Sequence, residues 1–278
     1  MKISCLVMSL LLLSAALPAQ QYIISTFAGG APPPTPARGV DLKISYPFGV
    51  AMDAVGTVYF ASDDAVFKLD QYGMVTRVAG NGHSGYAGDG GPATDAQFYG
   101  ANGIAVDGAG NLFIADTVNH RVRRVSQNGI IATVAGDGTT TRSPLPVDGS
   151  PAAITPMNTP SNVAVDSAGN LYVIDSPFIR KISTAGIVTT VAGCAASCSS
   201  GFGDGGPAVK ALLSPTAVIL DGAGNLYIAE NTGDRADVRK VSPNGIIAKL
   251  LAESGIAPRA WVTMDPPPRR PWPQGAWL

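Results

Sequence analysis

The sequence predicts an all-β fold, and three of its features point that way. A phrase of fifteen residues recurs four times, each copy reads as two apolar strands joined by a turn, and glycine and proline are abundant, with 33 and 22 residues. The copies span residues 48–62, 102–116, 161–175 and 216–230. The Asp that opens the turn recurs at steps of 54, 59 and 55 residues, as Asp53, Asp107, Asp166 and Asp221. Repetition at such a period is typical of stacked β units.

The second copy shows the strand order most clearly. Its apolar segments at 103–107, 112–116, 121–126 and 129–136 are separated by tight turns, which predicts a four-stranded antiparallel meander. About four such meanders in series predict the blades of a β-propeller. Because neighbouring blades would cover both faces of each sheet, we expect the aromatic residue that recurs in the second strand to fill the space between sheets. These residues are Tyr59, Phe113, Tyr172 and Tyr227.

The composition fits one body of short strands and argues against a nucleic-acid partner. The 278 residues are 46% hydrophobic and 14% charged, and no segment shows a long helical period. The formal net charge is -1 and the basic residues are scattered, so the chain lacks the clustered positive charge that attracts a polyanion. We therefore expect no nucleic acid among its partners.

The first twenty residues are typical of a signal peptide. Lys2 gives a positive end, residues 3–17 an apolar run, and Leu17-Pro-Ala19 a small-residue cleavage site. We therefore expect residues 1–20 to be removed and the mature protein to be secreted or periplasmic, with no membrane contact after cleavage. Residues 21–252 would form the repeat domain, and residues 253–278 an irregular proline-rich tail.

Acidic and basic residues recur together in three of the four copies. The second strand ends in an acid and the third strand carries an Arg, whereas the first copy has Ser62 and Phe67 at those places. Because acid and base are lost together, we expect them to form structural ion pairs within or between blades. The expected pairs are Asp116 with Arg123, Asp175 with Arg180, and Glu230 with Arg239.

The recurring phrase, with Asn119-His-Arg-Val122 behind it, resembles the NHL repeat. The resemblance covers about residues 22–252 and recurs four times in register. It implies an exported β-propeller of the bacterial NHL type, commonly closed with six blades and used as a rigid recognition surface. Four blades are incomplete relative to such a ring. Residues 22–29 resemble a fourth strand and would join the last blade as its outer strand.

The connections between the copies are longer than ring closure requires. A kernel at 88–93, Gly-Asp-Gly-Gly-Pro-Ala, returns at 203–208 and more weakly at 147–152. Long ordered loops on a rigid scaffold often carry binding residues, and the alternative is that the kernel is a tight turn that caps the groove between blades. On the binding interpretation the candidate residues are His83, Tyr86, Asp89, Phe202 and Asp204.

No catalytic residue, metal site or cofactor is predicted. His83 and His120 are the only two His and cannot make a three-His site, and one carboxylate in each kernel falls well short of the oxygens that Ca²⁺ takes. Gly80-Asn-Gly-His-Ser-Gly85 matches a phosphate-binding pattern, but no helix follows it. In an exported protein, Cys194 and Cys198 are expected to form a disulfide.

The preferred function is that of an exported, non-enzymatic propeller that binds a protein, peptide or glycan through its loop face. The first alternative is a metal-dependent enzyme that resembles the six-bladed lactonases or lyases, with a metal in the central channel. The second is a non-functional fragment produced by a shift of the reading frame. In the frame that begins with the last base of the Trp261 codon, the genetic code permits Gly-Asp-x-Gly-Pro-Ala, which is nearly the kernel between blades. On that hypothesis the frame slips near 253–261 and the chain is a truncated or frameshifted member of its family; a plain disordered tail is the rival interpretation.

Overall fold

The computed structural model describes residues 36–41, 44–62, 64–140, 148–194, 198, 202–231 and 236–252. The expected signal peptide at 1–20, the expected strand at 22–29 and the tail at 253–278 lie outside these residues. Within them, regular structure consists of β-strands and 3-10 turns of three residues each.

Four antiparallel sheets follow one another along the chain, and each contains one copy of the repeat. Their four-stranded meander order confirms the predicted all-β blades. Blade 1 contains β2 (Val50–Met52), β3 (Val58–Ser62), β4 (Ala65–Leu69) and β5 (Met74–Ala79). Blade 2 contains β6 (Ala101–Val106), β7 (Leu112–Asp116), β8 (Arg121–Val125) and β9 (Ile131–Ala135). Blade 3 contains β10 (Pro160–Val165), β11 (Leu171–Asp175), β12 (Phe178–Ile182) and β13 (Val188–Ala192). Blade 4 contains β14 (Pro215–Leu220), β15 (Leu226–Asn231), β16 (Ala236–Val241) and β17 (Ile247–Ala252).

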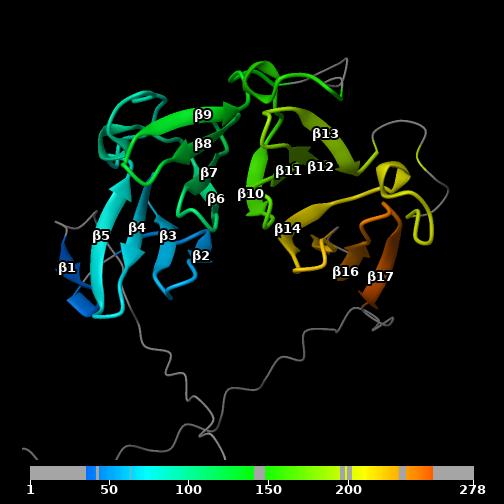
Figure 1. Cartoon of the computed structure of the whole chain (residues 1–278), viewed down its shortest axis with the longest axis horizontal. Helices are drawn as coiled ribbons and strands as arrows, with labels where there is room; N and C mark the ends of the chain where they lie inside the picture. Colours follow the sequence, from blue (N-terminus) through cyan, green and yellow to red (C-terminus); the bar gives the residue numbers. More distant parts are fainter. Residues whose placement is uncertain are drawn as a thin grey trace, which may run out of the picture.

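The blades are arranged in an arc around a common opening (Figure 1). The first strand of each blade, which is β2, β6, β10 or β14, lies nearest the opening, and the fourth strand lies farthest out. Blades 1 and 4 form the two ends of the arc and do not meet within the described part of the chain. The described residues therefore form an open series of propeller blades.

The recurring Asp forms the hairpin turn between the first and second strands. In blade 2, Oδ1 of Asp107 accepts the backbone N–H of Ala109 at 3.0 Å and of Asn111 at 2.8 Å, and Oδ2 accepts the Asn111 side chain at 2.7 Å. This arrangement is the Asx turn that favours Asp at such positions. In blade 4 the same hydrogen bonds, led by the one from the Asn225 side chain, lower the pKa of Asp221 to about 2.

Consecutive blades pack face to face. We call the face toward the preceding blade the leading face and the face toward the following blade the trailing face. Between blades 1 and 2, Ala61 and Val66 of the trailing face pack against Ile114 and Ile131 of the leading face, all of them fully buried. The recurring aromatic residue lies at these interfaces, because Phe113 is 6% and Tyr172 is 8% exposed.

Blade 1 differs from the other three, and its sequence explains why. A short strand that the sequence did not predict, β1 (Ala37–Arg38), pairs with β5 and makes this sheet five-stranded. Phe67 occupies the register position of the Arg in the other blades, is 1% exposed, and stacks on Phe60 with ring centroids 5.4 Å apart. An aromatic ring thus stands in blade 1 where the other blades have the buried Arg, and Ser62 stands at the position of the acid.

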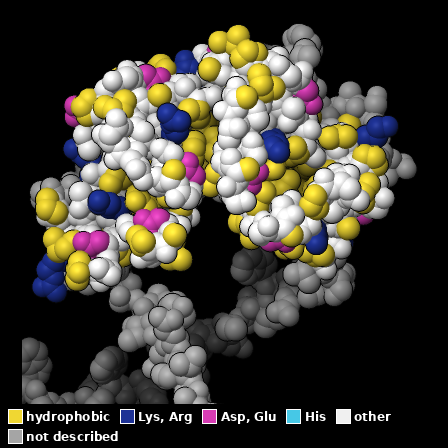
Figure 2. Space-filling view, viewed as in Figure 1, with side chains coloured by type: hydrophobic (Ala, Val, Ile, Leu, Met, Phe, Trp, Pro, Cys, Tyr) yellow, Lys and Arg dark blue, Asp and Glu magenta, His cyan; other side chains and the backbone are white. Residues whose placement is uncertain are grey.

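The two ends of the arc expose apolar residues that the interior blades bury. On the leading face of blade 1, Val50 is 68% and Met52 is 67% exposed, whereas Ile104, the equivalent of Val50 in blade 2, is 5% exposed. On the trailing face of blade 4, Ile219 is 64% exposed. Figure 2 shows apolar side chains gathered along the inner border of the arc and between neighbouring blades.

Because Val50 and Ile104 are equivalent but differ in exposure, substitutions at the two positions test whether the leading face of blade 1 is exposed in solution. We expect Ile104→Lys to lower the free energy of unfolding by several kcal/mol, about 3–5, because it places a charge between two blades. Val50→Lys should change it by no more than about 0.5 kcal/mol, because the side chain lies in water. Urea denaturation followed by far-UV circular dichroism measures both. An equal loss in the two variants would mean that the leading face of blade 1 is covered in solution.

Candidate functional site

The connections between blades form the loop face of the molecule. Each contains a 3-10 turn directly after the Pro of the kernel, and these turns are η2 (Ala93–Asp95), η3 (Ala152–Ile154) and η4 (Ala208–Lys210). The first residue of each turn joins two blades: Ala93 accepts the N–H of Gly80 at the end of blade 1 and donates its own N–H to Gly129 of blade 2, both at 2.8 Å. Ala152 and Ala208 repeat this arrangement. Each connection therefore fastens one blade to the next.

A buried Arg holds each kernel to the blade that follows it. Nη2 of Arg123 lies 2.8 Å from Oδ1 of Asp89 in the kernel, and Nη1 lies 3.3 Å from Oδ2 of Asp116 at the end of β7. The side chains of Arg123 and Asp116 are 0% exposed, and that of Asp89 is 33% exposed. The sequence indicated the pairing of Asp116 with Arg123, and the structure adds Asp89 as a third member. We call this arrangement an ion triad.

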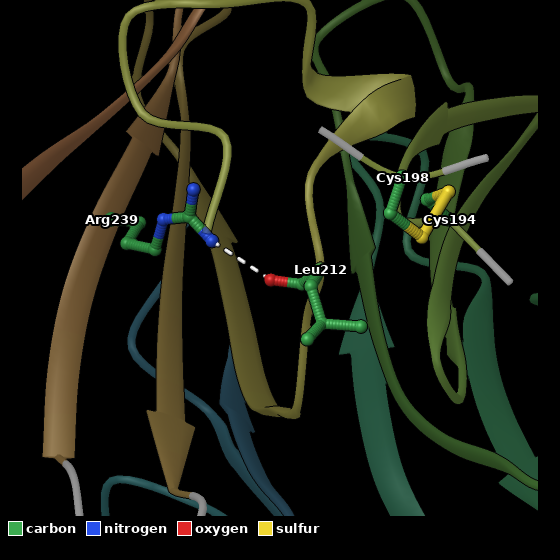
Figure 3. Close-up of a disulfide and its surroundings, with 4 residues drawn as sticks. All are labelled: Cys194, Cys198, Leu212 and Arg239. Atoms are coloured by element: carbon green, nitrogen blue, oxygen red, sulfur yellow. Dashed lines mark hydrogen bonds between the residues drawn. A yellow bond between two sulfur atoms is a disulfide. The ribbon is translucent and has the colours of Figure 1, made fainter. Parts of the chain in front are cut away.

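The other two connections contain the same kind of ion triad, with different distances between the charged atoms. In blade 4, Arg239 lies 3.0 Å from Asp204 and 3.3 Å from Glu230. It also donates to the carbonyl oxygens of Leu212 at 3.1 Å and Phe202 at 2.8 Å, and Figure 3 shows the first of these bonds.

The triad of blade 3 is looser. Arg180 lies 3.5 Å from Asp148 and 3.8 Å from Asp175. Asp148 belongs to the weak kernel at 147–152 and was not among the candidate residues. Its signal in the sequence was the Asp-Gly-Ser-Pro-Ala pattern, which places it three residues before Pro151, as Asp89 lies three residues before Pro92.

Burial and charge act in opposite directions on the two acids of the first triad. Burial raises the pKa of Asp116 above its ordinary value, although the N–H of Tyr99, the Asn119 amide and Arg123 all favour the carboxylate. Burial also raises the pKa of Asp89, but the hydrogen bond from Thr133 and the charge of Arg123 outweigh it, so the net pKa is lowered. The kernel acid is therefore the more firmly ionised partner of the Arg.

The candidate binding residues divide into exposed groups and groups that hold the loops. His83 is exposed, and Tyr86 and Phe202 are 45% and 42% exposed. Asp89 and Asp204 are the kernel members of two ion triads. Tyr86 belongs to both groups, because it is exposed and also contacts the first ion triad. Its hydroxyl donates to Oδ2 of Asp89 at 3.0 Å, and the guanidinium carbons of Arg121 and Arg123 lie 4.1 and 4.9 Å from its ring centroid.

Cys194 and Cys198 are joined in a disulfide within the connection that leads from blade 3 into blade 4 (Figure 3). Among the described residues no three His, Cys, Asp or Glu side chains lie close enough together to hold a metal ion. The helices within these residues are also too short to cross a membrane.

Comparison with known proteins agrees with this architecture. A family model described as the teneurin NHL domain matches residues 80–154 and 147–202. Teneurin-3 of Danio rerio is 34% identical over 171 residues, which are 59% of this chain and 6% of that protein. Teneurin-4 of Mus musculus is 34% identical over 178 residues, which are 60% of this chain and 6% of that protein. The chain thus spans about 6% of the length of these relatives.

Solved structures with the same fold include two proteins of Bacteroides. One is a protein of unknown function from Bacteroides thetaiotaomicron, with a TM-score of 0.53, 22% identity and coverage of 73% of this chain and 47% of that chain. The other is an auxiliary nutrient binding protein from Bacteroides ovatus, with a TM-score of 0.52, 22% identity and coverage of 76% and 50%. At this identity the likeness concerns the fold alone.

Successive four-stranded antiparallel meanders around a common opening define this protein as a β-propeller, with an open arc of blades in its described part. The recurring units are NHL repeats. The units at residues 80–154 and 147–202 match the model of the teneurin NHL domain, which supports this assignment.

Proposed function

We propose that the protein is an exported, non-enzymatic propeller that binds a protein, peptide or glycan through its loop face. The observation that carries the proposal is a set of exposed aromatic side chains on connections that are fixed to the blades. Tyr86 and Tyr99 on the first connection are 45% and 50% exposed, and Phe202 on the third is 42% exposed. Aromatic residues are enriched at binding surfaces because they bury a large area at little conformational cost.

The ion triads support this proposal because they keep the loops in one conformation before a ligand arrives. A loop that is already ordered loses less entropy on binding than one that must fold around its partner. Arg123 and Arg239 each join a kernel acid to a blade acid, and both are 0% exposed. The buried charges thus have a structural role, and the exposed rings are left to contact a partner.

The experiment is a binding screen with matched aromatic variants. The full chain, secreted by its native route, is applied to peptide and glycan arrays, and hits are measured by calorimetry. We expect Tyr99→Ala with Phe202→Ala to weaken binding by tenfold or more, as loss of aromatic contact residues does. Tyr72→Ala is the control, because Tyr72 is 80% exposed in the turn before β5, at the opposite end of that strand from the first connection. Absence of hits, or equal loss in both variants, would contradict the proposal.

Export and the limits of the domain belong to the same proposal. The signal pattern at 1–20 supports cleavage of that segment and a secreted or periplasmic location. The strand pattern at 21–252 supports a repeat domain with those limits. N-terminal sequencing of the secreted chain should give a first residue near Gln20 or Gln21. Genomic sequencing through the codons of residues 253–261 tests the frame slip. An in-frame stop shortly after that window, with no further repeat downstream, would remove the hypothesis in favour of a plain disordered tail.

A further inference from the structure

A small cavity on the loop face is lined by two aromatic residues and a carboxylate. It measures about 170 Å³ and lies where blades 1 and 2 meet, between Tyr46, Phe48, Asp64, Gly100 and Ala101. We infer that this cavity binds a cationic group, and specifically the Lys or Arg side chain of a peptide. The inference rests on the proposed function and names the ligand chemistry for one part of the loop face.

Two aromatic rings in this cavity face water instead of the core. Tyr46 is 78% and Phe48 is 62% exposed. The register of the inner strands makes them equivalent to Gly100 and Asn102 in blade 2, because Gly49 and Gly103 occupy the same position in the two blades. The repeat therefore does not require aromatic residues here. Exposed rings of this kind attract cations through the negative charge of their faces.

The backbone of Tyr46 is in the left-handed region, with φ of 45°. Its equivalent in blade 2, Gly100, has φ of 74°, a conformation that glycine adopts without strain. A bulky residue with positive φ is unusual and is typical of functional positions. The chain thus keeps an exposed Tyr at a position where its own second repeat has Gly.

Asp64 supplies the negative charge of the cavity and is held in place from two sides. Its Oδ1 accepts the backbone N–H of Gly100 at 2.7 Å, and its Oδ2 accepts the hydroxyl of Ser84. A carboxylate has about four acceptor sites, so two hydrogen bonds leave room for a cationic donor. A fixed carboxylate beside two rings suits a positive charge on an apolar stem, which is the chemistry of Lys and Arg side chains.

The test uses the Gly100 amide as a reporter, because its proton is hydrogen-bonded to Asp64. The probe is N-acetyl-arginine amide, titrated into ¹⁵N-labelled protein, and tetramethylammonium chloride is titrated separately at equal ionic strength. We expect the arginine probe to shift the Gly100 amide resonance in a saturable manner, and higher salt to weaken binding. Saturable shifts with tetramethylammonium alone would overturn the assignment to a peptide side chain in favour of a free quaternary ammonium ligand. No shift with either probe would overturn the site.

Three variants that the fold should tolerate test the cavity. Asp64→Asn keeps an acceptor for Gly100 and removes the charge, and we expect it to weaken probe binding about threefold to fivefold, as loss of an exposed ion pair does. Tyr46→Gly and Phe48→Asn install residue types found in blade 2, and each should weaken binding about twofold to fivefold. Tyr72→Ala should have no effect.

The outcomes separate this inference from the proposed function. If array ligands bind the wild type and the Tyr46→Gly, Phe48→Asn double variant equally, the cation site is wrong while the loop-face function stands. If the arginine probe binds at the cavity but the arrays give no ligand, the proposed function fails and the cavity is only a weak cation site. Unchanged probe binding in Asp64→Asn contradicts the inference directly.

Discussion

Replacement of Arg123 by Phe should lower the free energy of unfolding by about 3–5 kcal/mol, the usual effect of leaving a buried charge without its partner. The side chain of Asp116 is 0% exposed and lies 3.3 Å from the guanidinium. Without Arg123 it would retain only its hydrogen bonds from Tyr99 and Asn119. Urea denaturation of the full chain measures the loss.

The control for this prediction comes from blade 1, where the same positions are Ser62 and Phe67. The double variant Asp116→Ser, Arg123→Phe removes both buried charges and installs the pair that blade 1 already tolerates. We expect it to recover more than half of the stability that Arg123→Phe alone loses, because replacing both partners of a buried ion pair is often close to neutral. A double variant less stable than the single one would show that the pair contributes more than its own charge compensation.

Gly136→Ala should lower the free energy of unfolding by about 3–5 kcal/mol, because the added methyl has no space. Gly136 directly follows β9 with φ of 86°, and a Cβ there would lie 2.1 Å from the carbonyl oxygen of His120. That oxygen belongs to the turn between β7 and β8, so the clash could be relieved only by moving backbone. The matching glycines at the ends of blades 1 and 3, Gly80 and Gly193, show the same close approach.

Gly129→Ala is the matched control for this glycine. Gly129 has φ of 77° but no heavy atom within 4 Å of an added Cβ, so only the strain of the left-handed backbone remains, about 1–2 kcal/mol. Thermal unfolding of the two variants separates backbone strain from steric clash. Similar losses in both would show that the conformation, and not the contact with His120, requires glycine at residue 136.

Local sequence carried enough information for the strands and turns of every blade. The Asp of each hairpin turn is bonded to residues two and four positions ahead, as Asp107 is to Ala109 and Asn111, so a single phrase specifies it. The pairing of Asp116 with Arg123 was also indicated, because both are missing together from the first copy. β1 was not predicted, because a two-residue strand has too few residues to show a period.

The role of the kernels could not be predicted in the same way. Asp89 is 34 residues from Arg123 and lies in the connection between the first two copies, so its charge could be assigned either to a ligand or to the fold. The cavity beside Asp64 was missed because its members come from two blades. Tyr46 and Phe48 are two residues apart, but Gly100 and Ala101, which complete the cavity, come from the next repeat.

By itself, the sequence determined that this protein is a series of four-stranded NHL blades, because strand period and turn chemistry act between residues close in the chain. Only the tertiary structure decided which loop acids are bound by buried Arg residues and which aromatic side chains remain in water. Those outcomes depend on how neighbouring blades stack, since burial and charge pairing at the loop face are set by residues from two blades at once.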